Sequence, residues 1–250
     1  MARMRAIILA GGYAKRLWPL TLERPKPLLP IGDGYILDFI IAKIKAIEEI
    51  KDIIISTNKR FEGKFIEWVN ERGHRNIAVF PEPSLKEEEK LGPVKALDLI
   101  LGDVAPDDCL IAAGDNLFSL DLTKMVYFYT KMRSPVIALY EVASPELAKQ
   151  YACVELDKQS RIRGFTEKPA QPRSLLASTG IYLLPWSSLS KIKAYLAEGN
   201  PPDPIGRFIG WLTEHERAYG FKFSGYWCDI GSMESYRSAQ EDFKGRSYRS

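Results

Sequence analysis

Two patterns of hydrophobic and polar residues recur along this chain, and together they predict its secondary structure. One is a short, unbroken apolar run rich in β-branched residues, which is typical of a strand buried on both faces. The other places apolar residues three or four positions apart, as on one face of a helix. Strands are predicted over residues 6–10, 52–58, 77–80, 109–116 and 135–142, and helices over residues 35–47, 61–72, 94–101, 122–132, 208–217 and 233–243.

The alternation of strands and helices predicts an α/β protein with a doubly wound, mostly parallel, Rossmann-like central sheet. Such sheets bind ligands beyond the carboxyl ends of their strands, so the polar residues 56–58 should lie near the first strand's end. Residues 151–157 and 161–165 have the two-residue period of a β-hairpin. The proline-rich stretch 201–206 is expected to be a loop inside the fold, and a single domain over residues 1–250 is predicted.

The first apolar run leads into the stretch with the clearest chemistry. It ends at Gly11-Gly12, where the backbone can turn sharply and bring its amides close to a ligand. Lys15 and Arg16 follow, and Lys26 lies between two prolines. Amides and spaced cations are what a polyphosphate requires, although a plain turn with solvated cations has the same residue types. The stretch is neither a P-loop nor a GxGxxG fingerprint.

Composition and charge narrow the class of protein. The 250 residues are 46% hydrophobic and 27% charged, with 35 basic against 32 acidic residues and a net charge of +3. This balance predicts no nucleic-acid or membrane partner, and no apolar run approaches the roughly 20 residues of a membrane span. The basic start is followed by too short an apolar run for a signal peptide, so a cytoplasmic protein with reduced cysteines is expected. With two histidines, a multi-histidine metal site is not expected.

The whole first stretch carries a resemblance to a known family. It reads LAGG-x-x-x-RL-x-PLT-x-x-x-PKPLLP, similar to the signature loop of the sugar-1-phosphate nucleotidylyltransferases, which join a nucleoside triphosphate to a sugar 1-phosphate. The family's GGxGTRL has a third glycine where this chain has Ala14, and Lys15 adds a charge there. The resemblance implies that Arg16 takes the departing pyrophosphate and Lys26 the charge at the α-phosphate. It implies nucleotide-binding roles for Leu9, Ala10, Gly11, Gly12, Lys15, Arg16, Glu82 and Gly92.

Two aspartates distant in the sequence are the predicted metal ligands. Asp115 ends a predicted buried strand, where a lone Asp is commonly a helix cap. In the family that this chain resembles, however, the Gly-Asp pair at this point binds the catalytic magnesium, and the W-x-D-x-G motif supplies a second carboxylate, here Asp229. Mg²⁺ prefers oxygen ligands and typically takes one or two carboxylates together with phosphate oxygens. The resemblance therefore implies Mg²⁺ as cofactor, held by Asp115 and Asp229.

The predicted hairpin resembles the family's sugar-binding region, Y-G-x-V-E-x-D followed by F-x-E-K-P. Ala152 replaces the glycine whose amide contacts a sugar hydroxyl. The resemblance implies that Glu167 accepts from sugar hydroxyls and that Lys168 holds the sugar phosphate. The Thr179-Gly180 pair resembles a strand whose glycine lets the sugar ring approach the backbone. Outside this frame an exposed Glu-Lys pair would be unremarkable.

The resemblance predicts a nucleotidylyltransferase that releases pyrophosphate and forms a nucleoside-diphosphate sugar. A phosphate nucleophile is already largely ionised at neutral pH, so the chemistry requires positioning and charge neutralisation more than a general base. Two alternatives stay open: a cytidylyltransferase of a small alcohol phosphate, and a non-catalytic subunit that senses nucleotide sugars. A homo-oligomer is expected by resemblance alone. No part of the chain is left for the β-helix domain that longer relatives append.

Glu82 bears on the choice of base. Members that use UTP or dTTP commonly have a glutamine here, which can donate to and accept from the pyrimidine at once. An ionised glutamate can only accept, and guanine offers two adjacent donors. The sequence therefore favours GTP, and with it mannose 1-phosphate, unless Glu82 faces solvent or pairs with Lys86 or Lys90.

Overall fold

The structure, a computed structural model, describes residues 3–248 and is built around a large mixed sheet. A second, two-stranded sheet pairs β7 (Asn116–Phe118) with β13 (Trp227–Asp229), and a third pairs β2 (Pro30–Ile31) with β3 (Gly34–Tyr35). The large sheet has the spatial order β10 (Ile162–Glu167), β9 (Ala152–Leu156), β11 (Leu176–Leu184), β6 (Asp108–Ala113), β1 (Met4–Leu9), β4 (Ile50–Asn58) and β5 (Ile77–Glu82), with β8 (Val136–Glu141) paired to β11 and β12 (Tyr219–Phe223) paired to β8.

The central strands run in one direction, as the sequence predicted. β6, β1, β4 and β5 are parallel neighbours, and β12 is parallel to β8. Within the described residues, only β10 and β11 run against the other strands of the large sheet. The predicted hairpin is β9 and β10, which are antiparallel. The predicted α/β class with a mostly parallel sheet is confirmed.

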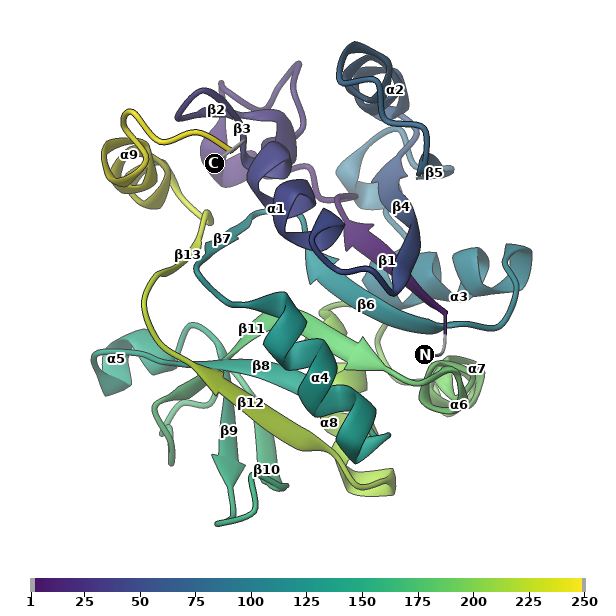
Figure 1. Cartoon of the computed structure of the whole chain (residues 1–250), viewed down its shortest axis with the longest axis vertical. Helices are drawn as coiled ribbons and strands as arrows, with labels where there is room; N and C mark the ends of the chain where they lie inside the picture. Colours follow the sequence, from purple (N-terminus) through teal and green to yellow (C-terminus); the bar gives the residue numbers. More distant parts are fainter. Residues whose placement is uncertain (1–2, 249–250) are drawn as a thin grey trace.

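Helices cover both faces of the sheet because its strands are apolar on both sides. Along β1, Ala6 and Ile8 contribute to one core and Ile7 to the other. Helices α1 and α4 lie in front of the sheet and α8 lies behind it (Figure 1). The first core includes side chains of α1 (Ile36–Lys45), α2 (Glu62–Glu71), α4 (Leu122–Met132) and α9 (Met233–Asp242), and the second those of α3 (Pro93–Asp103), α6 (Trp186–Leu189), α7 (Ile192–Ala197) and α8 (Ile205–His215).

Short elements complete the chain. Helix α5 (Pro145–Ala148) packs through Ala148 in a small cluster beside β9. Three 3₁₀ turns lie in loops: η1 (Lys15–Leu17), η2 (Lys26–Leu28) and η3 (Glu87–Glu89). Among residues 3–248, none of the helices has the length and apolar character needed to cross a bilayer.

Several predicted boundaries were wrong. The run 109–116 is not one strand, because it leaves the large sheet at Gly114-Asp115 and continues as β7 in the small sheet. The third strand extends beyond residue 80 to Glu82; Pro81 is tolerated because β5 is an edge strand. The predicted loop 201–206 ends early, since α8 begins at Ile205, directly after Pro204. Strand β12 was not predicted at all.

Candidate functional site

The signature loop turns sharply after β1 and is held by the end of β4. The Asn58 side chain donates a hydrogen bond to the Gly11 carbonyl (3.1 Å), and the Ala10 amide donates to the Ser56 carbonyl (2.7 Å). Neither Gly11 nor Gly12 has a positive φ, whereas Ala14 is left-handed with φ 49° and ψ 46°. The residue that replaces the family's third glycine thus adopts a conformation that L-residues other than Asn and Asp rarely visit.

A pocket of about 370 Å³ opens at the carboxyl ends of the parallel strands. The structure places most of the predicted nucleotide-binding residues on it, with the exceptions of Ala10, which is buried, and Lys15. Sequence reasoning did not assign Lys90 and Asp203 to it; these two form a 2.9 Å ion pair at the pocket. The lining consists of Leu9, Gly11, Gly12, Arg16, Ser56, Glu82, Lys90, Gly92, Pro93, Ala96, Asp115 and Asp203.

Lys26 reaches Asp115, at the edge of this pocket, because η2 packs against the end of β6. A side chain at Gly114 would lie 3.1 Å from the Pro27 ring and 3.1 Å from the Leu9 carbonyl oxygen, so glycine permits the close approach. The Lys26 ammonium then donates to Asp115 Oδ2 at 2.6 Å and to the Ile230 carbonyl at 2.9 Å. The two side chains are 15% and 26% exposed, so water screens this ion pair only partly.

The small sheet brings the second predicted carboxylate to the same place. Asp229 pairs with Asn116 in the β7–β13 register, and the Ile230 amide donates to the Asp115 carbonyl at 3.1 Å. Burial and the Asp115 carboxylate raise the pKa of Asp229 to about 6, although Lys26, Arg16 and Lys168 act in the opposite direction. Two carboxylates that repel each other in a partly buried site are suited to share a divalent cation.

The donor set fits magnesium bound together with a substrate. Residues 3–248 contain no cluster of three or more His, Cys, Asp or Glu side chains that could hold a metal ion. Asp115 and Asp229 supply oxygen ligands, and Mg²⁺ is usually held by one or two carboxylates with phosphate oxygens and water completing its shell. Chain and polyphosphate together would complete that coordination.

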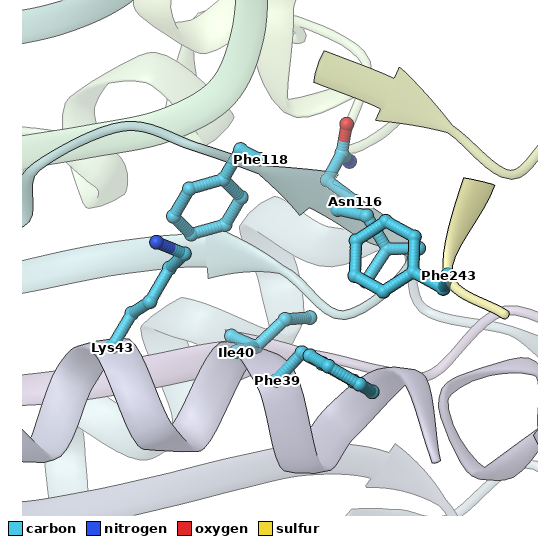
Figure 2. A pocket seen from close by; sticks show the side chains of 7 residues that line it. Phe39, Ile40, Lys43, Asn116, Phe118 and Phe243 are labelled. Carbon is cyan, nitrogen blue, oxygen red and sulfur yellow. The ribbon is translucent and has the colours of Figure 1, made fainter. Parts of the chain in front are cut away.

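Asn116 and Trp227 are site residues that sequence reasoning missed. The Trp227 indole N–H donates to Asn116 Oδ1 (2.7 Å), and Asn116 Nδ2 donates to Asp115 Oδ1 (3.0 Å). Asn116 also lines a small hollow of about 30 Å³, enclosed by Phe39, Phe118 and other side chains (Figure 2). Asn116 is buried, and the Trp227 donor on its carbonyl oxygen fixes its amide. With Lys26 on Oδ2, both Asp115 oxygens are held in place. Trp227 is part of the W-x-D-x-G motif, but only the fold shows that it binds Asn116.

Lys15 lies apart from the pocket lining. Its ammonium makes ion pairs with Glu87 (3.0 Å) and Glu88 (3.1 Å), and both carboxylates raise its pKa. Lys15 therefore joins the signature loop to the turn η3. A nucleotide-binding role for Lys15 stays a prediction that requires it to exchange these partners.

Glu82 is buried, and protein groups occupy its carboxylate. The Ser84 hydroxyl donates to Oε1 at 2.8 Å, and the Leu91 amide donates to Oε2 at 3.1 Å. Neither anticipated exception applies, because Glu82 does not face solvent and its carboxylate binds Ser84 and Leu91, not Lys86 or Lys90. The carboxylate braces the turn before Gly92, whose φ is +83°, and so shapes the pocket wall.

The predicted sugar-side residues form a second group. Ala152 and Glu167 are register partners in the β9–β10 hairpin, and the Lys168 amide donates to the Tyr151 carbonyl at 3.2 Å. Lys168 lowers the pKa of Asp229, which places its charge near the paired carboxylates. The Thr179 side chain is buried and donates to the Ala138 carbonyl (3.0 Å), so its hydroxyl faces the core. Gly180 has φ +74° and a side chain there would lie 3.0 Å from the Ala113 methyl.

Matches to known proteins extend over nearly the whole chain. Residues 5–245 match the family described as nucleotidyl transferase. A glucose-1-phosphate adenylyltransferase of Desulforamulus reducens is 32% identical over 259 residues, covering 95% of this chain and 63% of that protein. One of Clostridium acetobutylicum is 28% identical over 256 residues, covering 95% and 66%. The chain thus spans less than two thirds of the length of these relatives.

A solved structure has the same fold as this chain over nearly its whole length. It is a crystal structure assigned as a glucose-1-phosphate thymidylyltransferase from Bacillus anthracis, in complex with sucrose. It superposes with a TM-score of 0.86 at 27% identity, covering 98% of this chain and 96% of that one.

The comparisons do not support the expectation of GTP and mannose 1-phosphate. The relatives and the solved structure are named for glucose 1-phosphate with adenylyl or thymidylyl transfer. The Glu82 carboxylate, which was expected to accept from guanine, accepts from the Ser84 hydroxyl and the Leu91 amide instead of being held free for a base.

Proposed function

The chain belongs to the nucleotidyl transferase family, and from this premise we propose that it joins a nucleoside triphosphate to a sugar 1-phosphate and releases pyrophosphate. The convergence of Lys26 and Asp229 on Asp115, which lines the pocket beside Gly11, carries this proposal. The named relatives share glucose 1-phosphate and differ in the base, so glucose 1-phosphate is the proposed sugar.

Each group has a role in the transfer. The sugar phosphate oxygen attacks the α-phosphorus, and the bond from that phosphorus to the departing pyrophosphate breaks. Lys26 neutralises charge at the α-phosphate, and Arg16 binds the pyrophosphate. Asp115 and Asp229 would hold Mg²⁺, which supplies further charge neutralisation to phosphate oxygens when bound. Asn116 and Trp227 orient Asp115, while Glu167 and Lys168 bind the sugar and its phosphate.

Pyrophosphate release tests the proposal. Purified protein is given Mg²⁺ and each combination of ATP, dTTP, UTP, GTP or CTP with glucose 1-phosphate, another sugar 1-phosphate or phosphocholine. We expect release with glucose 1-phosphate and not with phosphocholine or with nucleotide alone. Release with CTP and phosphocholine would instead support the cytidylyltransferase alternative. Absence of release from every pair, with nucleotide sugar still bound, would support a sensing subunit.

A further inference from the structure

Helix α8 approaches strand β10 unusually closely at Gly206. A side chain built at Gly206 would place its Cβ 2.0 Å from Glu167 Oε2, 3.1 Å from Cδ and 3.8 Å from Oε1. Gly206 is the second residue of α8, and Glu167 is the last residue of β10. The Glu167 carboxylate therefore occupies the space that any other residue at position 206 would fill with its own side chain.

The same face of α8 packs closely one turn further on. A side chain at Gly210 would lie 3.2 Å from the Phe165 ring. Phe165 and Glu167 are two positions apart on β10, so they point to the same side of the strand. Glycines spaced four apart on α8 thus face alternate residues of β10, and the contact at Gly206 belongs to a continuous interface.

Two cations partly offset the burial of the Glu167 carboxylate, whose pKa is raised overall. Burial raises the pKa of Glu167, while Lys168 next to it and Arg207 next to Gly206 lower it. Asp203, just before the helix, has the smaller opposite effect. The start of a helix also favours negative charge because its first amides have no partner within the helix.

We propose that Gly206 is a positioning residue, whose missing side chain sets the place of the Glu167 carboxylate for the sugar 1-phosphate. This rests on the proposed function, in which Glu167 accepts from the sugar hydroxyls. The structure thereby assigns a role in sugar recognition to α8, an element that carries none of the family's motifs in this sequence.

If Gly206 were needed only for folding, Gly206→Ala would lower stability and would not affect the sugar substrate selectively. The atom that meets a new Cβ is the far end of a flexible side chain, so Glu167 can swing away without disturbing the backbone. To reach even 3.0 Å from that Cβ, Oε2 must move by about 1 Å. Misplacement of a positioning group by 1 Å can cost about 100-fold in catalysis. The fold would tolerate the change, whereas sugar recognition would not.

The test compares Gly206→Ala with the wild type. We expect the KM for glucose 1-phosphate to rise at least about tenfold, with the KM for the nucleotide changed less than about twofold and the melting temperature nearly unchanged. Gly102→Ala is the matched control, because Gly102 also lies in a helix, α3, and a Cβ there meets nothing within 4 Å. It should leave both KM values unchanged.

A double-mutant cycle with Glu167→Asp isolates the pair. The shorter aspartate does not reach the space at position 206, so the effect of Gly206→Ala in that background should shrink to less than about twofold. An undiminished effect there, an unchanged KM for the sugar phosphate, or an equal rise in both KM values would overturn the proposal.

Crystal structures of the wild type and of Gly206→Ala separate this inference from the proposed function. We expect the Glu167 carboxylate to be displaced by at least about 1 Å in the variant. A carboxylate in the same place would overturn the positioning role even if the enzyme turns over. Displacement in a protein that releases no pyrophosphate from any substrate pair would overturn the proposed function and, with it, the role in sugar recognition.

Discussion

Lys26→Met tests the centre of the site because the methionine keeps most of the apolar stem and removes the charge. The Lys26 ammonium is 2.6 Å from Asp115 Oδ2 and 2.9 Å from the Ile230 carbonyl oxygen. The backbone around it is stiff, since Pro25 and Pro27 flank it at the turn η2. The substitution should therefore remove two hydrogen bonds while leaving the path of the loop unchanged.

The expected loss of stability follows from these contacts. A hydrogen bond to a charged group contributes about 1.5–3 kcal/mol, and a carbonyl left without a partner adds about 1 kcal/mol. Exposure of 15% for Lys26 and 26% for Asp115 keeps solvent screening modest. The free energy of unfolding should fall by about 2–4 kcal/mol. Removing a cationic donor from the developing charge should lower kcat by about 100- to 1,000-fold, with a smaller effect on nucleotide affinity.

Urea denaturation and steady-state pyrophosphate release measure the two effects. Lys64→Met, at an exposed lysine paired with Glu67, is the control and should change unfolding by less than about 0.5 kcal/mol. In an Asp115→Asn background the cost of Lys26→Met should shrink by about 1–2 kcal/mol, because the ion pair is already absent. Unchanged stability would refute the ion pair. A raised nucleotide KM with kcat intact would make Lys26 a binding residue only.

Three further predictions address the metal ligands, the loop and the network behind Asp115. Asp115→Asn and Asp229→Asn should each lower kcat by about 100-fold or more, and Asp115→Asn should also lower the free energy of unfolding by about 1–2 kcal/mol because it removes the ion pair with Lys26. Chelator should abolish wild-type activity; full activity in chelator would remove the metal assignment. Ala14→Gly should raise the free energy of unfolding by about 0.5–1 kcal/mol, because glycine adopts φ 49° without strain; a lower midpoint in urea would contradict this. Trp227→Phe should lower turnover about tenfold and raise the Mg²⁺ concentration needed, whereas Trp211→Phe, whose N–H binds a surface glutamate, should not; equal effects would argue against the network.

Much of the fold was visible in the sequence because local patterns report burial. Unbroken apolar runs marked the central strands, and apolar spacing marked the long helices α1, α2, α3, α4 and α9 to within two or three residues. Helix α8 was found but placed late at its start. Strand β12 escaped prediction because Tyr219–Phe223 contains glycine and lysine and has no long apolar run. Its place is set by pairing with β8.

For the candidate site too, the residue types were predictable from the sequence and the contacts between them were not. Residue types at strand ends and in the first loop indicated which groups bind phosphate, and the structure places Gly11, Arg16 and Asp115 on one pocket. The hydrogen-bond and ion-pair partners of the site residues were not predictable from the sequence. Glu82 was expected to read a base and instead binds Ser84 and Leu91, because the closeness of β5 to the turn before Gly92 depends on tertiary packing.

By itself, the sequence determined the α/β class, the family resemblance and the chemical inventory of cations and carboxylates, because each depends on residue type and short-range spacing. Tertiary structure alone decided which of these groups meet. The pairing of β7 with β13 brings Asp229 to Asp115, and the packing of α8 on β10 places the Glu167 carboxylate over Gly206. Contacts between segments distant in the sequence arise from the mutual fit of whole elements, which no local pattern encodes.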